Sequence, residues 1–309
     1  MSGPTSQGPR ASSAVAYAAL TIAAVVWGGS IVGQKYALSS FSAVEVSVFR
    51  GIGALLILIP LWWVQEGKVV AVQGRDVAIL CALGLGVLGN HLLTLFGLRY
   101  ISAASAGVII GASPAITALL SSVLVKDVPF GKVAAGCLLS FVGVALVSGL
   151  GGGAAAGEQP LLGGLLVLLG LVSWALYTIG SGAIMGRLSA LTVNWTTLLI
   201  SIVLQVPLLW SDQKVLNSGF GAVPVGGWLA LGYLIVFATA LGQQAWLYGV
   251  QGVGPSRAGV FVNLIPVSAL LLSALVLGES VGAMEMVGIV LILAGVWLVG
   301  YQTRTAQEA

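Results

Sequence analysis

Apolar stretches of about twenty residues follow one another along almost the whole chain, separated by short polar or glycine- and proline-rich segments. A helix rises about 1.5 Å per residue, so about 20 apolar residues cross the hydrocarbon core of a bilayer. We therefore expect an all-α membrane protein with ten transmembrane helices. The predicted spans are residues 14–35, 42–64, 76–98, 102–125, 130–150, 161–185, 189–210, 225–249, 256–277 and 282–301.

The second half of the chain repeats the pattern of the first. The segment from Gly107 to Pro114 reads GVIIGASP, and the segment from Gly259 to Pro266, which lies 152 residues later (259 − 107), reads GVFVNLIP. The same offset then holds without a gap to the end of the fifth and tenth predicted helices. Self-similarity at a fixed spacing indicates an internal duplication, here of a unit of five helices.

Five is an odd number, so the second unit must enter the membrane in the opposite orientation to the first. Two such units form inverted repeats about a pseudo-twofold axis in the membrane plane. That axis exchanges inside and outside, so the topology alone allows the cavity to open to either side in turn, which is alternating access. The expected organisation is a disordered tail at 1–13, a first repeat at 14–150, a linker at 151–160, a second repeat at 161–301 and a C-terminal tail at 302–309.

Composition supports lipid as the solvent. Only 7% of the residues are charged, 58% are hydrophobic and the mean hydropathy is +1.08, which no soluble domain of this length accommodates. The segments on the side of both termini carry eight lysine and arginine residues, and the connections on the other side carry three. This excess predicts cytoplasmic N- and C-termini. The net charge of +3 gives no indication of nucleic acid. One histidine and two separated cysteines make no zinc site, so we expect no metal or cofactor.

The two mid-span prolines mark the predicted centre of the molecule. Pro114 and Pro266 each remove a helical hydrogen bond and push on the carbonyl four residues earlier, that of Ile110 or Val262. In hydrocarbon such a carbonyl must face protein or a water-filled cavity. One proline alone would indicate a packing kink, but the matched pair favours two helix hinges beside a transport site.

Polar and aromatic side chains inside the spans are costly in lipid and carry the functional hypothesis. They suit a small, polar organic molecule with an apolar part, such as an amino acid. For each the alternative is a packing role: a neutral histidine bonded to a neighbouring helix, or a tryptophan that fills space. The candidate substrate-binding residues are Asn90, His91, Trp174, Tyr177, Gln244 and Asn263.

Arg50 lies within the second span, where a charge must find a partner or reach the interface. Glu45 and Glu285 are near the outer span ends in the predicted topology and are candidate partners. Contact with a substrate carboxylate is the alternative. We favour a structural or gating ion pair, because Arg50 precedes the polar clusters and has no counterpart in the second repeat.

Five short motifs follow one another along these spans: Trp27-Gly28, Phe49-Arg50, Pro114, Pro266 and Gly278-Glu279. Their order and spacing resemble those of the EamA-type members of the drug/metabolite transporter superfamily. Within that superfamily the chain is most similar to the YddG-type amino acid exporters. The first copy departs from the pattern, with Lys126-Asp127 where the second has Gly278-Glu279.

The resemblance implies a monomeric exporter of the bacterial inner membrane with a central cavity between two five-helix halves. We therefore expect a secondary transporter that exports small amphipathic metabolites, chiefly aromatic and other neutral amino acids. The alternatives are the same fold with nucleosides, drugs or other metabolites as cargo. An intramembrane enzyme would need a nucleophile–base pair or a metal set, and a channel would need a selectivity filter; neither is visible in the sequence.

Overall fold

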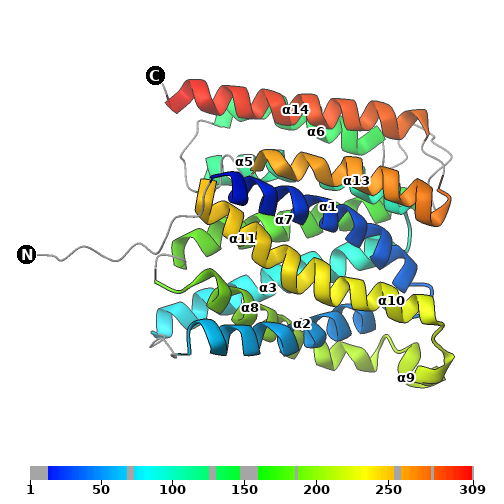
Figure 1. Cartoon of the computed structure of the whole chain (residues 1–309). Helices are drawn as coiled ribbons and strands as arrows, with labels where there is room; N and C mark the ends of the chain where they lie inside the picture. Colours follow the sequence, from blue (N-terminus) through cyan, green and yellow to red (C-terminus); the bar gives the residue numbers. More distant parts are fainter. Residues whose placement is uncertain are drawn as a thin grey trace, which may run out of the picture.

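The computed structural model describes residues 13–67, 73–124, 130–146, 159–184, 187–253, 259–279 and 282–307. Within these ranges the chain forms a bundle of helices that run side by side (Figure 1). Almost all of the predicted tail at 1–13, most of the linker at 151–160 and the whole Lys126-Asp127 pair lie outside the described residues.

The helices follow the predicted spans closely, and several spans consist of more than one helical segment. The first half contains α1 (Ser13–Ala37), α2 (Ala43–Gln65), α3 (Gly74–Gly97), α4 (Ala103–Ile110), α5 (Ser113–Leu124) and α6 (Phe130–Ala145). The second half contains α7 (Pro160–Ile184), α8 (Ala190–Gln205), η2 (Val206–Trp210), α9 (Val215–Ser218), η3 (Phe220–Ala222), α10 (Val225–Tyr233), η4 (Leu234–Leu241), α11 (Gly242–Val253), η5 (Gly259–Asn263), α13 (Leu264–Leu272), η6 (Ser273–Leu277) and α14 (Ala283–Gln307). Of the η segments, η4 and η6 are π-helical and the others are 3₁₀ turns.

The outer surface of the bundle is apolar. Among the described residues, seven helical segments are long and apolar enough to cross a membrane, and three shorter apolar helices lie at 134–145, 261–277 and 283–298. Large apolar side chains project outward, with Leu56, Leu275 and Val64 exposed to 73%, 80% and 83%. Water would penalise so much exposed apolar surface. The all-helical membrane fold predicted from the sequence is therefore confirmed.

Serine residues begin several helices by the same mechanism. The Ser42 hydroxyl accepts the backbone N–H of Glu45, whose carboxylate accepts the N–H of Ser42 in return. Ser189 caps α8 in the same way by accepting the N–H of Thr192. These caps satisfy N–H groups that the first helical turn leaves without a partner. Ser42 and Ser189 begin the second helix of their halves, so the duplicated sequence uses the same start signal twice.

Both proline-containing spans are interrupted less than one turn before the proline. Helix α4 ends at Ile110, two turn residues follow, and α5 carries Pro114. In the second half the 3₁₀ segment η5 ends at Asn263, and α13 carries Pro266. Proline lacks an N–H and crowds the carbonyl four residues back, which favours a break at both positions. Helix α2, by contrast, runs through Pro60 without an interruption.

Corresponding helices of the two halves pack against each other in antiparallel fashion. On α6 and α14, a Cβ added to Gly143 would lie 2.7 Å from the Gly288 carbonyl oxygen, and one added to Gly295 would lie 2.4 Å from that of Gly136. Residue numbers thus rise along α6 as they fall along α14. Glycine at these positions lets the two backbones approach closely, as in many membrane helix pairs.

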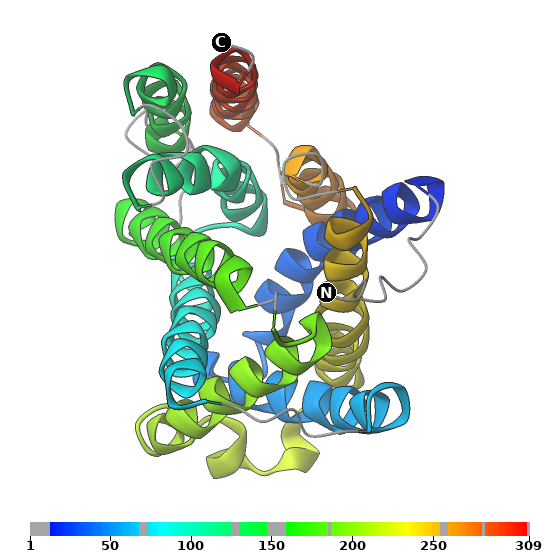
Figure 2. The same cartoon turned by 90° about the vertical axis from the view of Figure 1, so that its left-hand side faces the viewer.

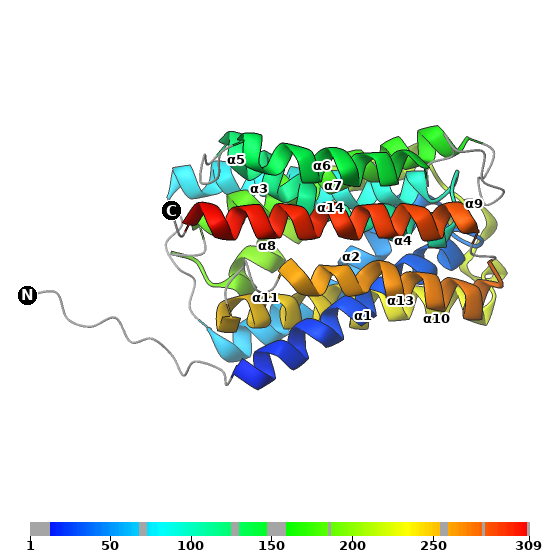
Figure 3. The ribbon, with the colours of Figure 1, turned by 90° about the horizontal axis from the view of Figure 1, so that it is seen from above.

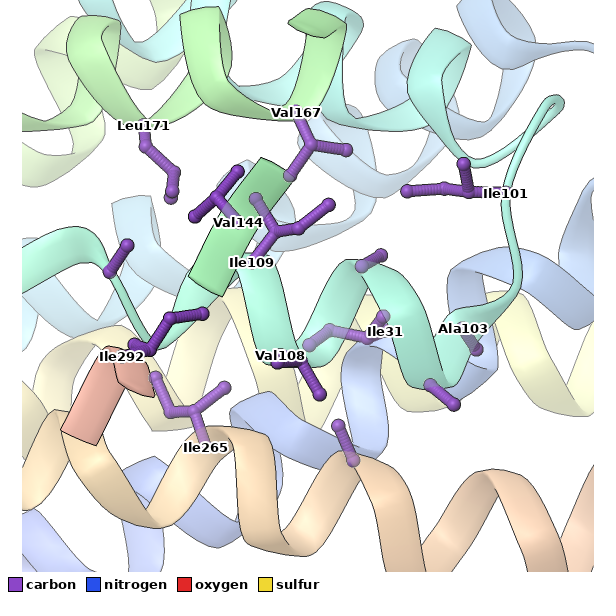
Figure 4. Close-up of a cluster of buried hydrophobic side chains, with 14 of the residues drawn as sticks. Ile31, Ile101, Ala103, Val108, Ile109, Val144, Val167, Leu171, Ile265 and Ile292 are labelled. Atoms are coloured by element: carbon purple, nitrogen blue, oxygen red, sulfur yellow. The ribbon is translucent and has the colours of Figure 1, made fainter. Parts of the chain in front are cut away.

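The two proline-containing spans form a second antiparallel pair at the core, through α4 of the first half and α13 of the second. A Cβ on Gly107 would lie 2.4 Å from the Cβ of Ala269, and one on Gly111 would lie 3.1 Å from the Pro266 ring. Figure 4 shows α4 between α7 and α13, with Ile109 directed toward Val144. The two interrupted helices therefore touch each other at the centre of the bundle.

The remaining helices alternate between the two halves. Helix α7 of the second half packs along α3 of the first, and α1 of the first packs along α10, η4 and α11 of the second. Figures 2 and 3 give the end-on and top views of this arrangement. The start of α1 and the end of α14 lie at one end of the bundle, and α9 lies at the other, here called the α9 end (Figure 1).

Candidate functional site

A cavity of about 120 Å³ lies inside the bundle and takes its walls from both halves. Its volume is comparable to the ~150 Å³ engineered cavity that holds a benzene ring. One part of the wall is polar and another is aromatic. The polar lining residues are Ser30, Gln34, Arg50, Asn90, His91, Thr94, Ser113 and Gln243, and the aromatic ones are Trp27, Trp174 and Trp246.

The helix interruptions supply part of this wall. Ile110 and Ser113 flank the break between α4 and α5, and Val262 and Ile265 flank the one between η5 and α13. The carbonyls that the prolines leave without their helical N–H belong to Ile110 and Val262. Two residues placed by the duplicated breaks thus line the cavity. Neither proline is itself a lining residue.

Arg50 sits in the polar part of the wall and is 8% exposed. Its Nε donates to the Thr239 hydroxyl at 2.5 Å, and its Nη2 lies 3.4 Å from Nε2 of His91. Thr239 in turn donates to the Leu234 carbonyl five residues earlier, at 2.8 Å, within the π-helical turn η4. The π-helix therefore positions a hydroxyl that accepts a hydrogen bond from the buried guanidinium.

The prediction that Arg50 pairs with Glu45 or Glu285 is wrong. The Glu45 carboxylate accepts the backbone N–H groups of Ser42, Lys214 and Leu216. Glu285 accepts the hydroxyl of Ser105 and the N–H of Gly282. Both carboxylates are thus held at the α9 end by helix starts and loops. Helix N-termini leave several N–H groups free and carry partial positive charge, so they compete well for a carboxylate.

The aromatic part of the wall is built around Trp27. Its ring centroid lies 6.0 Å from that of Trp174 with the planes at 84°, and 5.2 Å from that of Trp246 at 42°. The Trp27 Nε1–H donates to the Ala238 carbonyl at 3.1 Å, which fixes the ring. Edge-to-face and tilted contacts of this kind favour a rigid arrangement. The three indoles therefore present a preformed apolar surface to the cavity.

Three of the six predicted substrate-binding residues line the cavity. These are Asn90, His91 and Trp174. Asn90 also donates from Nδ2 to the Gly170 carbonyl at 3.1 Å, so part of its side chain serves the contact between α3 and α7. Their role in substrate binding stays a prediction.

The other three predicted residues lie outside the lining. Tyr177 is buried behind Trp174, with ring centroids 5.2 Å apart. On α11 the adjacent Gln243 faces the cavity instead of Gln244. Asn263 ends η5, and its Oδ1 is buried without a hydrogen-bond partner among the described residues, as is Oε1 of Gln244.

Trp246 is not among the residues predicted from the sequence, and for Arg50 the sequence favours a structural or gating ion pair over contact with a substrate, although both residues line the cavity. Trp246 lies one helical turn after Gln243 on α11, so the spacing would have put both on one face if that face had been identified first. The choice between Gln243 and Gln244 depends on helix rotation, which two adjacent glutamines do not reveal.

The α9 end is closed by a layer of hydrogen bonds between segments far apart in the chain. Lys35 Nζ at the end of α1 donates to the carbonyls of Leu98 and Ile101, at 2.6 and 2.8 Å. Glu279 accepts the N–H groups of Ala103 and Ala104 at the start of α4, both at 3.0 Å. These contacts join α1, α3, α4 and the segment after η6 at this end.

A second group of contacts at the α9 end involves the segment before α9. The Asp212 carboxylate pairs with Arg99 at 3.0 Å, and its backbone carbonyl accepts the Ser42 hydroxyl at 2.6 Å. Lys214 donates from Nζ to the Ser39 carbonyl at 2.5 Å. Together with the bonds to Glu45, these contacts tie the connection between α8 and α10 to the loop between α1 and α2.

Comparison with known proteins places this architecture in a family. The sequence pattern of the EamA-like transporter family matches residues 14–149 and again residues 161–301. The chain belongs to the EamA-like transporter family. The family unit therefore occurs twice in one chain, on either side of the segment at 150–160.

Several relatives of similar length are named as transporters. An uncharacterized transporter of Bacillus subtilis, YyaM, is 29% identical over 265 residues, which cover 85% of this chain and 86% of the relative. The uncharacterized inner membrane transporter YedA of Escherichia coli is 24% identical and aligns over 92% of this chain and 90% of its own length. One crystal structure matches with a TM-score of 0.64 at 20% identity, covering 96% of this chain and 98% of that one, which supports the fold. The EamA-type resemblance predicted from the motifs is confirmed, and the protein is a membrane transporter.

Proposed function

We propose that this EamA-family transporter is a secondary carrier that exports small amphipathic metabolites, chiefly aromatic and other neutral amino acids, across the bacterial inner membrane. The observation that carries the proposal is the cavity itself. Its wall joins a polar cluster, including Arg50, His91 and Asn90, to three tryptophans. Pockets for small molecules combine apolar walls with a few convergent polar groups in this way.

The carrier works by alternating access between two inverted repeats of five transmembrane helices each. The antiparallel packing of α6 on α14 and of α4 on α13 supports this arrangement, because an axis that relates corresponding antiparallel helices exchanges the two ends of the bundle. The matched family units and the duplicated helix breaks support it as well. Pro114 and Pro266 are the proposed hinges.

Both termini are cytoplasmic in this proposal, and the α9 end faces the outside. The hydrogen-bonded layer around Glu45, Asp212 and Glu279 is then the outer gate in its closed state. A carrier must have the gate on one side closed while the other opens, so these contacts form and break once in each transport cycle. The protein works as a monomer, with the lipid bilayer around its apolar outer surface.

Counterflow in proteoliposomes tests the proposal. Vesicles loaded with unlabelled phenylalanine should transiently accumulate external labelled phenylalanine, because a carrier exchanges solutes through one site while a pore does not. Replacing Trp174 with alanine removes one wall of the cavity and should lower the initial rate at least about fivefold, the effect of losing more than 1 kcal/mol of contact. Trp63→Ala is the matched control, because Trp63 is 67% exposed on the outer surface.

Normal counterflow by the Trp174→Ala protein would contradict the assignment of the cavity as the transport site. Linear flux that does not saturate with substrate concentration would identify a pore. A scan of solutes in the same vesicles, including nucleosides and cationic drugs, separates the amino acid proposal from the same fold with another cargo.

A further inference from the structure

The guanidinium of Arg50 is a buried positive charge whose described contacts are to neutral groups. Thr239 accepts from Nε, and His91 lies beside Nη2. Arginine only donates hydrogen bonds, so the contact requires Nε2 of His91 to accept and the imidazole to be neutral. These two contacts use two of the five N–H groups of a guanidinium. Arg50 also lines the cavity. A residue in the wall of a transport site is in position to contact the bound solute.

None of the acidic residues that the structure describes neutralises this charge. Each of the six has hydrogen-bond or ion-pair partners elsewhere, at one end of the bundle or the other, and none lines the cavity. Burying a charge without a counterion costs free energy, so buried charges are usually paired. The six described acidic residues are Glu45, Glu66, Asp76, Asp212, Glu279 and Glu285.

The chemistry of the wall around Arg50 selects the class of ligand. A guanidinium presents parallel N–H groups that match the two oxygens of a carboxylate. A single cation balances a single negative charge. The three tryptophans on the aromatic part of the wall accept a ring or a branched apolar chain, and the ring-sized volume fits one such group. Indole faces attract an ammonium group, but in this lining it would find no carboxylate and would be repelled by the positive charge of Arg50.

We infer that Arg50 is a specificity-determining residue that binds the carboxylate of the transported solute, and that the substrates are amphipathic monocarboxylates in which an amino group is dispensable. This inference rests on the proposed function and deepens it, because it names the recognised group. The substrate carboxylate then supplies the counterion that the described part of the chain does not.

A matched series of four compounds tests the inference by equilibrium binding to the whole protein in detergent or nanodiscs, measured by titration calorimetry. The compounds share a phenyl ring and a short chain and differ in charge: 3-phenylpropanoate is an anion, phenylalanine a zwitterion, 3-phenylpropanamide neutral and 2-phenylethylamine a cation. We expect the anion and the zwitterion to bind. The amide and the amine should bind at least about tenfold more weakly, the effect of losing hydrogen bonds to a charged group.

The Arg50→Gln variant should weaken binding of 3-phenylpropanoate about ten- to a hundredfold and leave the amide unchanged. The Arg50→Lys variant should lie between, because it keeps the charge and loses the paired geometry. Arg75→Gln is the control, since Arg75 is exposed on the same helix as His91, and it should bind as the parent does.

Equal binding of the amide and the carboxylate to the parent protein overturns the inference, whether or not the Arg50 variants fold. Full carboxylate affinity in a folded Arg50→Gln protein does so too. Absence of binding by all four compounds also overturns it. In each of these cases counterflow with any other solute would leave the carrier proposal intact, so the two failures are distinguishable.

Discussion

Substituting alanine for Gly107 tests whether the contact between α4 and α13 is as close as the structure has it. The added Cβ would lie 2.4 Å from the Cβ of Ala269, which is fully buried. Carbon atoms pack best about 3.5–4.0 Å apart, so the helices would have to separate by more than about 1 Å. Forcing extra atoms into a packed core costs about 1–3 kcal/mol.

A matched control removes the part of the effect that comes from helix propensity. Alanine favours a helix over glycine by about 0.8–1.0 kcal/mol wherever the residue is helical. Gly232 on α10 is helical, and a Cβ added there meets nothing within 4 Å. Gly232→Ala should therefore be neutral or stabilising. The difference between Gly107→Ala and Gly232→Ala isolates the overpacking, with an expected value of about 1–3 kcal/mol.

The assay is equilibrium unfolding of the purified variants in mixed detergent micelles, followed by tryptophan fluorescence. Adding Ala269→Gly to the Gly107→Ala protein removes the methyl group that clashes, so the double variant should recover most of the overpacking term, as a double-mutant cycle measures. If Gly107→Ala and Gly232→Ala change the unfolding free energy equally, or if Ala269→Gly gives no relief, the close crossing of the broken helices is refuted.

Three further predictions concern the α9 end, the arginine site and the topology. Glu279→Gln should lower the unfolding free energy by about 0.3–2 kcal/mol, because a charge is lost at the N-terminus of α4. An unchanged melting temperature would show that Glu279 does not help to close the α9 end. Thr239→Val should cost about 1.5–3 kcal/mol in the same unfolding assay by leaving Nε of Arg50 without its acceptor, whereas a neutral effect would show that the bond is dispensable. With the two native cysteines replaced, a cysteine at the exposed position Asn217 should react with an impermeant thiol reagent on intact cells, and one at Arg75 only after permeabilisation; the reverse pattern contradicts the proposed orientation.

The partner of Arg50 could not be identified from the sequence, for a physical reason. A charge inside a span demands a partner, and the sequence offered carboxylates at the same predicted depth. It could not show that Glu45 and Glu285 are already held by the N–H groups at helix starts. Nor could it show that the π-helical turn of η4 positions Thr239 beside the guanidinium. A single extra residue in a helical turn rotates every later side chain, and apolar sequence carries no signal of it.

The candidate site was predicted in kind and only partly in detail. Asn90, His91 and Trp174 line the cavity because polar and aromatic residues in mid-span must face protein or water. Tyr177, one turn from Trp174, is buried behind it instead, and Gln243 takes the place expected for Gln244. These choices depend on helix rotation and on which neighbouring helix covers a face. Uniformly apolar helices specify neither, because their hydrophobic pattern has no strongly preferred side.

The sequence by itself determined what repeats and what is costly: helices long enough for lipid, a pattern that occurs twice at a fixed offset, and a matched pair of mid-span prolines that disfavour a continuous helix. Local backbone chemistry and the energetics of lipid fix these features without reference to distant residues. Only the tertiary structure decided which side chains meet. The glycine contacts that bring α4 against α13, and the helix starts that claim Glu45 and Glu285, leave Arg50 and three tryptophans facing one cavity. Packing of segments far apart in the chain sets those positions, and periodicity within one helix does not encode it.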